Sequence, residues 1–128
     1  MKLKHSQVAP VRAKLMASQG GKCPLCERSF TGRNAVKPAL DHCHTNGHIR
    51  DVLCLNCNGM EGKIFNLARR MMKDNPTLAV ERLSSYWTKH RTSQHGLIHP
   101  THKTETEKRI ERNAKARKRR AAAKAAKG

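Results

Sequence analysis

Four of the five cysteines form two pairs with the same internal spacing. Cys23-Pro-Leu-Cys26 and Cys54-Leu-Asn-Cys57 are C-x-x-C units separated by 27 residues. A two-residue gap lets both thiolates of a pair reach one metal ion, and two pairs complete a tetrahedral site with no open position. We therefore expect a structural zinc ion held by all four cysteines. The alternatives are a redox pair, a disulfide or unrelated packing, and disulfides are the less favoured use of cysteine in a cytosolic chain.

Acidic, amide and histidine side chains lie on both sides of the second cysteine pair. Leu40-Asp41-His42-Cys43-His44 lies between the two cysteine pairs, and Asn58 and Glu61 follow the second pair. Asp41 and Asn58 both offer oxygen, which is the ligand type that Mg²⁺ requires. His42 would stand beside such a cation as a base. The alternative is a carboxylate that does no more than orient a surface histidine.

The spacing of apolar residues predicts the elements that hold these side chains. We expect a helix over residues 6–19 with Ser6 as its cap, and a β-hairpin from Leu40 to Leu53 with Asn46-Gly47 as a two-residue turn. Further helices are expected from Cys57 to about Lys73 and from Thr77 to about Arg91. In this order the end of the first strand faces the start of the following helix, so Asp41 and Asn58 can share one cation. Zinc would fasten the N-terminal segment to the base of that helix.

The apolar faces of the three expected helices are large for so small a core. They comprise residues 8–15, 64–72 and 78–87, and we expect Leu78, Leu83 and Trp87 to point inward. Pairing these faces between two chains would bury them. An ordinary monomer core uses the same pattern, so the sequence leaves both arrangements open.

The charge balance points to a polyanionic partner. The 128 residues carry 27 Lys and Arg against 9 Asp and Glu, a formal charge of +18. Nucleic acid is the first candidate and an anionic membrane surface is the second. No apolar run is long enough to span a membrane, and the N-terminus has no apolar stretch typical of a signal peptide. We therefore expect a soluble protein without membrane association that stays in the cytoplasm where it is made.

Much of this charge lies in the last 26 residues. Residues 103–128 hold 11 Lys and Arg against 3 Glu and contain one large apolar residue, Ile110. We expect residues 101–128 to form a basic, flexible tail that becomes helical on DNA. A solvated arm without a partner is the alternative. The residues expected to contact DNA are Lys115, Arg117, Lys118, Arg119 and Arg120.

Three sequence blocks together resemble the phage recombination endonuclease VII family, which belongs to the HNH, or His-Me finger, nuclease superfamily. The blocks are G-K-C-P-L-C, L-D-H-C-H-x-x-G-x-I-R-D-V-L-C-x-x-C-N and E-G-K, within residues 21–63. Weaker similarity extends through Ser85-Tyr86-Trp87 to Ile98-His99-Pro100. The resemblance implies an α+β, mostly helical fold with a small ββα-metal finger, a four-cysteine zinc site and flanking helices. It implies a nuclease domain over residues 1–100, ahead of the basic tail.

The resemblance also assigns roles to the clustered side chains. It implies that Asp41 and Asn58 bind Mg²⁺, for which Mn²⁺ can substitute, and that His42 is the general base. It further implies that His44 and Glu61 assist at the scissile phosphate or the metal. The expected reaction is hydrolysis of a DNA phosphodiester to a 5′-phosphate and a 3′-hydroxyl. Family members are homodimers that cut branched DNA such as four-way junctions, in the host cytoplasm where the protein is phage-encoded.

The sequence departs from the family pattern in two places. Cys43 occupies a position that is acidic in the best-known member of the family, and strand alternation is expected to turn it away from the face of His42 and His44. A basic tail also replaces a longer C-terminal domain, which bears on selectivity for junctions. Arg50 is a candidate phosphate contact because a guanidinium binds phosphate in two places; a solvated strand arginine is the alternative.

Two other functions remain compatible with the sequence. One is an HNH enzyme that nicks duplex DNA or cuts it nonspecifically. The other is a non-catalytic zinc-ribbon protein that binds DNA or modulates transcription. A zinc-ribbon protein would need the cysteines and basic residues but would have no use for Asp41, His42 and Asn58 together.

Overall fold

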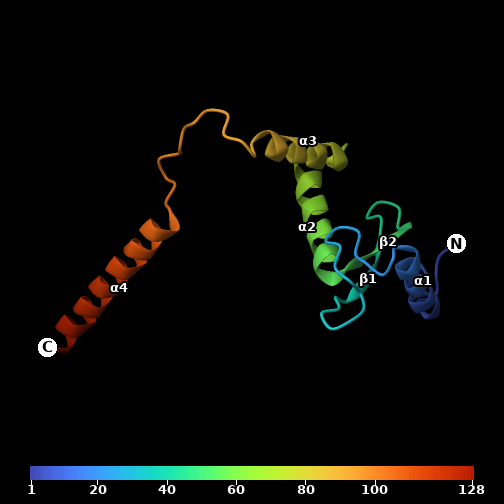
Figure 1. The fold of residues 1–128 in the computed structure, drawn as a ribbon, viewed down its shortest axis with the longest axis horizontal. Coiled ribbons are helices and arrows are strands. Elements are labelled where there is room, and N and C mark those ends of the chain that lie inside the picture. The colour runs from blue at the N-terminus through green and yellow to red at the C-terminus, as the bar shows by residue number, and fades with distance from the viewer. The chain divides into compact units, whose positions relative to one another are not determined.

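The computed structural model describes all 128 residues and falls into two units, Met1–Thr88 and Lys89–Gly128. The fold class is α+β, with four helices and one antiparallel sheet of two strands. No helix is both long enough and apolar enough to cross a membrane. The elements, labelled in Figure 1, are α1 His5–Ser18, β1 Pro38–His42, β2 Ile49–Cys54, α2 Leu55–Met71, α3 Pro76–Lys89 and α4 Glu105–Lys127.

Helix α1 confirms the first expected helix within one residue at each end. Lys4, not Ser6, is its N-cap residue, because the Gln7 side chain accepts the backbone N–H of Lys4 at 2.8 Å. After the helix ends, Gly20 and Gly21 both have positive φ, at 70° and 71°. Only glycine adopts this conformation without a steric cost, so the pair turns the chain sharply away from the helix axis.

Gln19, which follows α1, ties that helix to the sheet. Its side-chain oxygen accepts the N–H of Val52 at 2.7 Å, and its amide nitrogen donates to the carbonyl of Val52 at 2.9 Å. Val52 is fully buried, and without Gln19 its two backbone groups would lose these partners. Burying such groups unpaired costs about 1–3 kcal/mol, so the contact fixes where α1 meets β2.

The hairpin between the cysteine pairs is present, but its turn is longer than expected. The strands pair in register from Pro38 opposite Cys54 to Leu40 opposite Val52. The prediction of a two-residue turn at Asn46-Gly47 is therefore wrong. The loop closes through Cys43 instead, whose N–H donates to His48 O at 2.8 Å and whose carbonyl accepts the N–H of Gly47 at 2.9 Å.

The register shifts just before this loop. His42 lies opposite Ile49 instead of Arg50, so two residues of β2, Arg50 and Asp51, lie opposite the single residue Asp41. This is a β-bulge, which bends a strand and redirects its side chains. An unbroken register would put Arg50 opposite His42; the shift brings it beside Asp41.

The core is small and lies in the first unit. The hairpin contacts both α1 and α2, as Figure 1 shows, and β1, β2 and α2 follow one another directly along the chain. The buried residues of the cluster are Cys23, Phe30, Val52, Leu53, Cys54 and Cys57. Half of them are cysteines, so the interior depends on sulfur in place of large apolar side chains.

The apolar faces of α2 and α3 are mostly uncovered in the single chain. Leu83 is 41% exposed and Trp87 is 64% exposed, so the expectation that both point inward is wrong for one chain. Leu67 and Met71 on α2 are also exposed, and only Ala68 and Cys57 of that helix are buried. The two helices together line an apolar groove of about 450 Å³.

Helix α4 contains most of the segment for which the sequence predicts a DNA-binding tail. The Thr104 side chain caps it by accepting the N–H of Glu107 at 3.2 Å. Glu105 and Glu107 lie in its first turn and basic residues in its last, which suits the helix dipole. Lys103 bonds to Glu111 at 2.6 Å and lowers the pKa of that carboxyl. After Glu111 the helix carries no acidic residue, so its charge is entirely positive from there.

Candidate active site and metal centre

The four paired cysteines meet at one point of the core. Their sulfur atoms all lie within 4.8 Å of one another, and Cys26 Sγ and Cys54 Sγ are 3.9 Å apart. A tetrahedral zinc with Zn–S bonds of about 2.3 Å separates its sulfurs by about 3.8 Å. The cluster therefore has the ligands and size for one zinc ion. Cys23 and Cys26 come from the turn after α1, and Cys54 and Cys57 from the start of α2.

Backbone N–H groups point at these sulfurs. Cys54 N donates to Cys23 Sγ at 3.4 Å, and Cys57 N donates to Cys54 Sγ at 3.3 Å. Burial raises the pKa of Cys23, but backbone hydrogen bonds from Cys26, Cys54 and Leu25 outweigh it and lower the pKa to about 6. Hydrogen bonding to Cys54 and burial raise the pKa of Cys57 to about 12. Several thiolates this close together repel one another, and a divalent cation would hold them in place.

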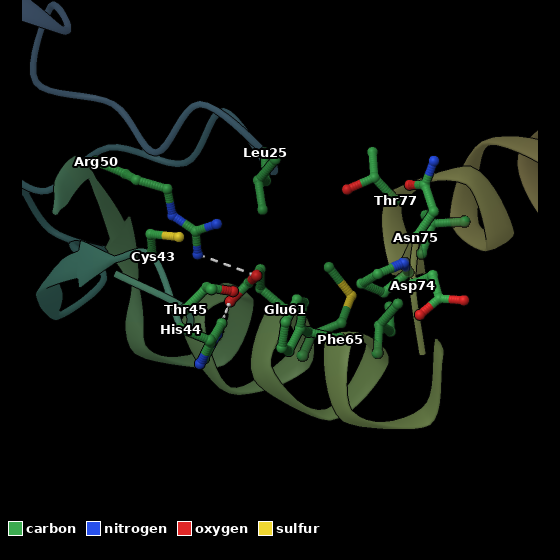
Figure 2. A pocket seen from close by; sticks show the side chains of 14 residues that line it. Leu25, Cys43, His44, Thr45, Arg50, Glu61, Phe65, Asp74, Asn75 and Thr77 are labelled. Atoms are coloured by element: carbon green, nitrogen blue, oxygen red, sulfur yellow. Dashed lines mark hydrogen bonds and ion pairs between the residues drawn. The ribbon is translucent and has the colours of Figure 1, made fainter. Parts of the chain in front are cut away.

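A second cluster lies where the hairpin meets α2. Asp41 is 5% exposed, and both of its oxygens accept from Arg50, at 2.6 Å from Nε and 3.0 Å from Nη2. Arg50 Nη2 also lies 3.0 Å from Glu61 Oε1. His44 Nε2 lies 2.8 Å from Glu61 Oε2, as Figure 2 shows. Asp41, Arg50, Glu61 and His44 therefore form one connected network.

Arg50 is an ion-paired residue in this structure, neither fully solvated nor free. Hydrogen bonding to Asp41 is the largest influence on it and, with Glu61, raises its pKa despite partial burial. The guanidinium therefore stays charged and offsets the two carboxylates. One cation shared by Asp41 and Glu61 shows that the site accommodates positive charge among oxygen donors.

His42 and Asn58 lie beside this network without belonging to it. His42 is the exposed last residue of β1, and its ring centroid is 6.0 Å from that of His44. Asn58 is half-buried in the first turn of α2, three residues before Glu61, and residues at that spacing share a helix face. The structure joins Asp41, His44 and Glu61 through one network and places the His42 ring near that of His44. No bond joins Asp41 directly to Asn58.

A hollow of about 580 Å³ opens next to the network (Figure 2). The hairpin loop, the first turns of α2 and residues 74–77 line it. Cys43 lines it together with His44, so the expectation that alternation turns Cys43 to the other face is wrong. The strand ends at His42, and alternation does not continue into the loop. Backbone hydrogen bonds from Asn46 and Thr45 lower the pKa of the Cys43 thiol.

Two structural partners escaped the sequence analysis. Phe65 stacks on His44 with ring centroids 4.8 Å apart and planes 17° apart. Its position four residues after Glu61 places both on one face of α2, which helical spacing could have revealed. The pairing of Arg50 with Asp41 depends on the β-bulge, for which the sequence carries no signal that we recognise.

Comparison with protein families decides the relationship. The sequence profile of the recombination endonuclease VII family matches residues 2–89. The chain belongs to the recombination endonuclease VII family. Comparison with curated proteins gave no match.

Membership of the endonuclease VII family indicates a nuclease, a hydrolase whose substrate is DNA. The matched region contains α1, the hairpin, α2 and α3, and therefore both the cysteine cluster and the Asp41 network. Helix α4 lies outside it. The two side-chain clusters and the basic helix therefore belong to separate parts of the chain.

We predict about one zinc per chain and loss of folded structure when it is removed. Structural zinc contributes roughly 10–16 kcal/mol in small peptides, which exceeds the stability of a typical domain. Cys54→Ser should lower both zinc content and helical circular dichroism. Cys43→Ser is the matched control and should change neither, because Cys43 lies outside the four-sulfur cluster. A folded, zinc-free wild-type protein would contradict the prediction.

Proposed function

We propose that this chain is a Mg²⁺-dependent endonuclease of the HNH, or His-Me finger, class that hydrolyses phosphodiester bonds in branched DNA such as four-way junctions. The observation that carries the proposal is the convergence of Asp41, His44 and Glu61 beside the exposed His42. The direct succession of β1, β2 and α2 supports a ββα finger. The family membership supports DNA as the substrate. We further propose that the protein meets this DNA in the cytoplasm.

His42 is the general base in this proposal. Its ring is exposed and its nitrogens bond to no protein group, so a water molecule can reach them. A neutral imidazole there takes the proton of the attacking water. His44 is held by Glu61 and by the Phe65 ring, so its ring has a fixed orientation at the edge of the hollow. We assign His44 and Glu61 to positioning the scissile phosphate.

Asp41 and Asn58 are the proposed ligands of the catalytic metal. Both supply oxygen, and the neighbouring carboxylates already share one cation, so their chemistry fits Mg²⁺, with Mn²⁺ as a substitute. When bound, such a metal stabilises the negative charge that develops on the phosphate and leaving oxygen. The four cysteines take the zinc ion, which is structural because they leave no ligand position open.

DNA contact is assigned to Arg50 and to α4. Arg50 is 39% exposed at its side chain and faces the hollow, so it can reach a phosphate. Five basic residues of α4 supply affinity that does not depend on sequence, because each neutralised phosphate releases counterions. They are Lys115, Arg117, Lys118, Arg119 and Arg120.

Parallel cleavage of a four-way junction, a nicked duplex and a linear duplex tests the proposal. We expect Mg²⁺-dependent cutting of the junction that EDTA abolishes. His42→Ala should slow it by roughly 10²–10⁴-fold, since it removes only proton transfer, and should leave zinc content and DNA affinity unchanged. His48→Ala, in the same hairpin loop, is the matched control.

Each failure of that experiment points to a different conclusion. Undiminished cleavage by His42→Ala would overturn the assignment of the base. Equal cutting of linear duplex would indicate a nicking or nonspecific nuclease. Absence of cleavage in Mg²⁺ on every substrate would indicate a non-catalytic zinc-ribbon protein.

Deletion of residues 103–128 should weaken binding to every DNA sequence and flatten its salt dependence. The segment carries 11 basic and 3 acidic residues, and each lost phosphate contact lowers the slope of log Kobs against log salt by about 0.9. Binding titrations at several salt concentrations measure the slope, and zinc content checks the remaining fold. Coinciding slopes with and without the segment would mean that α4 does not contact DNA.

We propose a homodimer in which α2 and α3 cover the corresponding faces of a second chain. Leu67 is 60% exposed and Trp87 64%, and a soluble monomer rarely leaves a contiguous apolar patch of this kind uncovered. Sedimentation should show a dimer that Leu67→Glu dissociates. Ile110→Glu is the control, because Ile110 is 59% exposed on α4. A wild-type monomer at working concentration would reject the dimer.

A further inference from the structure

Arg50 occupies the position between the two carboxylates of the candidate site. Its guanidinium engages both oxygens of Asp41 and one oxygen of Glu61, at 2.6 to 3.0 Å. The remaining oxygen of Glu61 bonds to His44. Every carboxylate oxygen of the site therefore already has a partner.

This arrangement also restricts access to Asp41. The residue is 5% exposed, and the bulge of β2 sets the guanidinium against its two oxygens. A metal ion approaching Asp41 meets a bidentate bond and a like charge. Each Asp41 oxygen keeps a second lone pair, but Mg²⁺ bound at about 2.0–2.1 Å would place two positive charges close to the guanidinium, so the two cations compete for the same carboxylate.

We propose that Arg50 is the internal counter-ion of the metal-free site, and that metal binding at Asp41 displaces its guanidinium. This inference rests on the proposed metal site at Asp41. The charge of Arg50 neutralises the buried carboxylate until the metal replaces it. Its side chain is 39% exposed and borders the hollow, so the displaced group has solvent and space to move into.

Displacement gives Arg50 two successive partners. The guanidinium first pairs with Asp41, and after release it is free to pair with a phosphate, which it binds with the same two-pronged geometry. Metal binding and phosphate binding are then coupled: each favours the state in which Arg50 has left Asp41. An arginine with a purely structural role would not couple metal binding to phosphate binding.

The test is Mg²⁺ binding to the full-length, zinc-loaded protein without DNA, measured by titration calorimetry. Arg50→Gln removes the competitor and should bind Mg²⁺ about 10-fold more tightly, equivalent to about 1.4 kcal/mol. Arg50→Lys keeps the charge but loses the bidentate bond to Asp41. It should bind Mg²⁺ more tightly than wild type, but by a smaller factor than Arg50→Gln. Arg33→Gln, in an exposed loop, removes the same charge elsewhere and should match wild type.

The sign of the change separates the two roles of Arg50. If Arg50 only supports the site, both variants bind Mg²⁺ equally or more weakly, which overturns the inference. If Arg50→Gln fails to fold, nuclear magnetic resonance of the wild-type Arg50 Nε–H during Mg²⁺ addition decides: a signal that keeps its ion-paired position at saturation overturns the inference.

The result is distinguishable from failure of the proposed function. Tight Mg²⁺ binding with no gain in the Arg50 variants, together with junction cleavage, rejects only the displacement. Absence of Mg²⁺ binding by every variant rejects both the displacement and the proposed metal site.

Discussion

Four cysteine sulfurs within 4.8 Å of one another tie together segments that are distant in the sequence. The turn after α1 supplies two, and the junction of β2 and α2 supplies the others. Seven apolar or cysteine residues of 128 are buried, and three of them belong to this cluster. So small a core gains little from apolar burial alone. The four-cysteine cluster therefore sets the position of the hairpin against α2. It thereby also sets the distance from Asp41 to Glu61.

The sequence predicted the parts of the structure that have local or spacing-based causes. The C-x-x-C spacing identified the four-cysteine cluster, and apolar periodicity located α1, α2 and α3 within a few residues. The residue types of Asp41 and His42 pointed to the second cluster, and the resemblance to the endonuclease VII family added His44 and Glu61. Each of these features is determined by residues close together in the chain or by the chemistry of the side chain itself.

The remaining features depend on contacts between elements. The loop after His42 is longer than Asn46-Gly47 alone predicts, because Cys43 and His48 pair across it. The register shift that brings Arg50 to Asp41 is a property of two paired strands, not of either strand. The exposure of Leu83 and Trp87 depends on what lies opposite them, which one chain's sequence does not specify. Local patterns therefore locate elements well and predict their partners poorly.

The bond between Gln19 and Val52 has a consequence for how the sheet meets other chains. A two-stranded sheet has two open edges, and open edges accept strands from neighbouring molecules and promote aggregation. The N–H and carbonyl of Val52 both point away from β1, and the Gln19 side chain takes both. A single amide thus imitates a third strand at the buried centre of β2. A strand from another molecule would have to displace the Gln19 side chain to pair with Val52. One side chain therefore protects this edge, where otherwise a third strand would be needed.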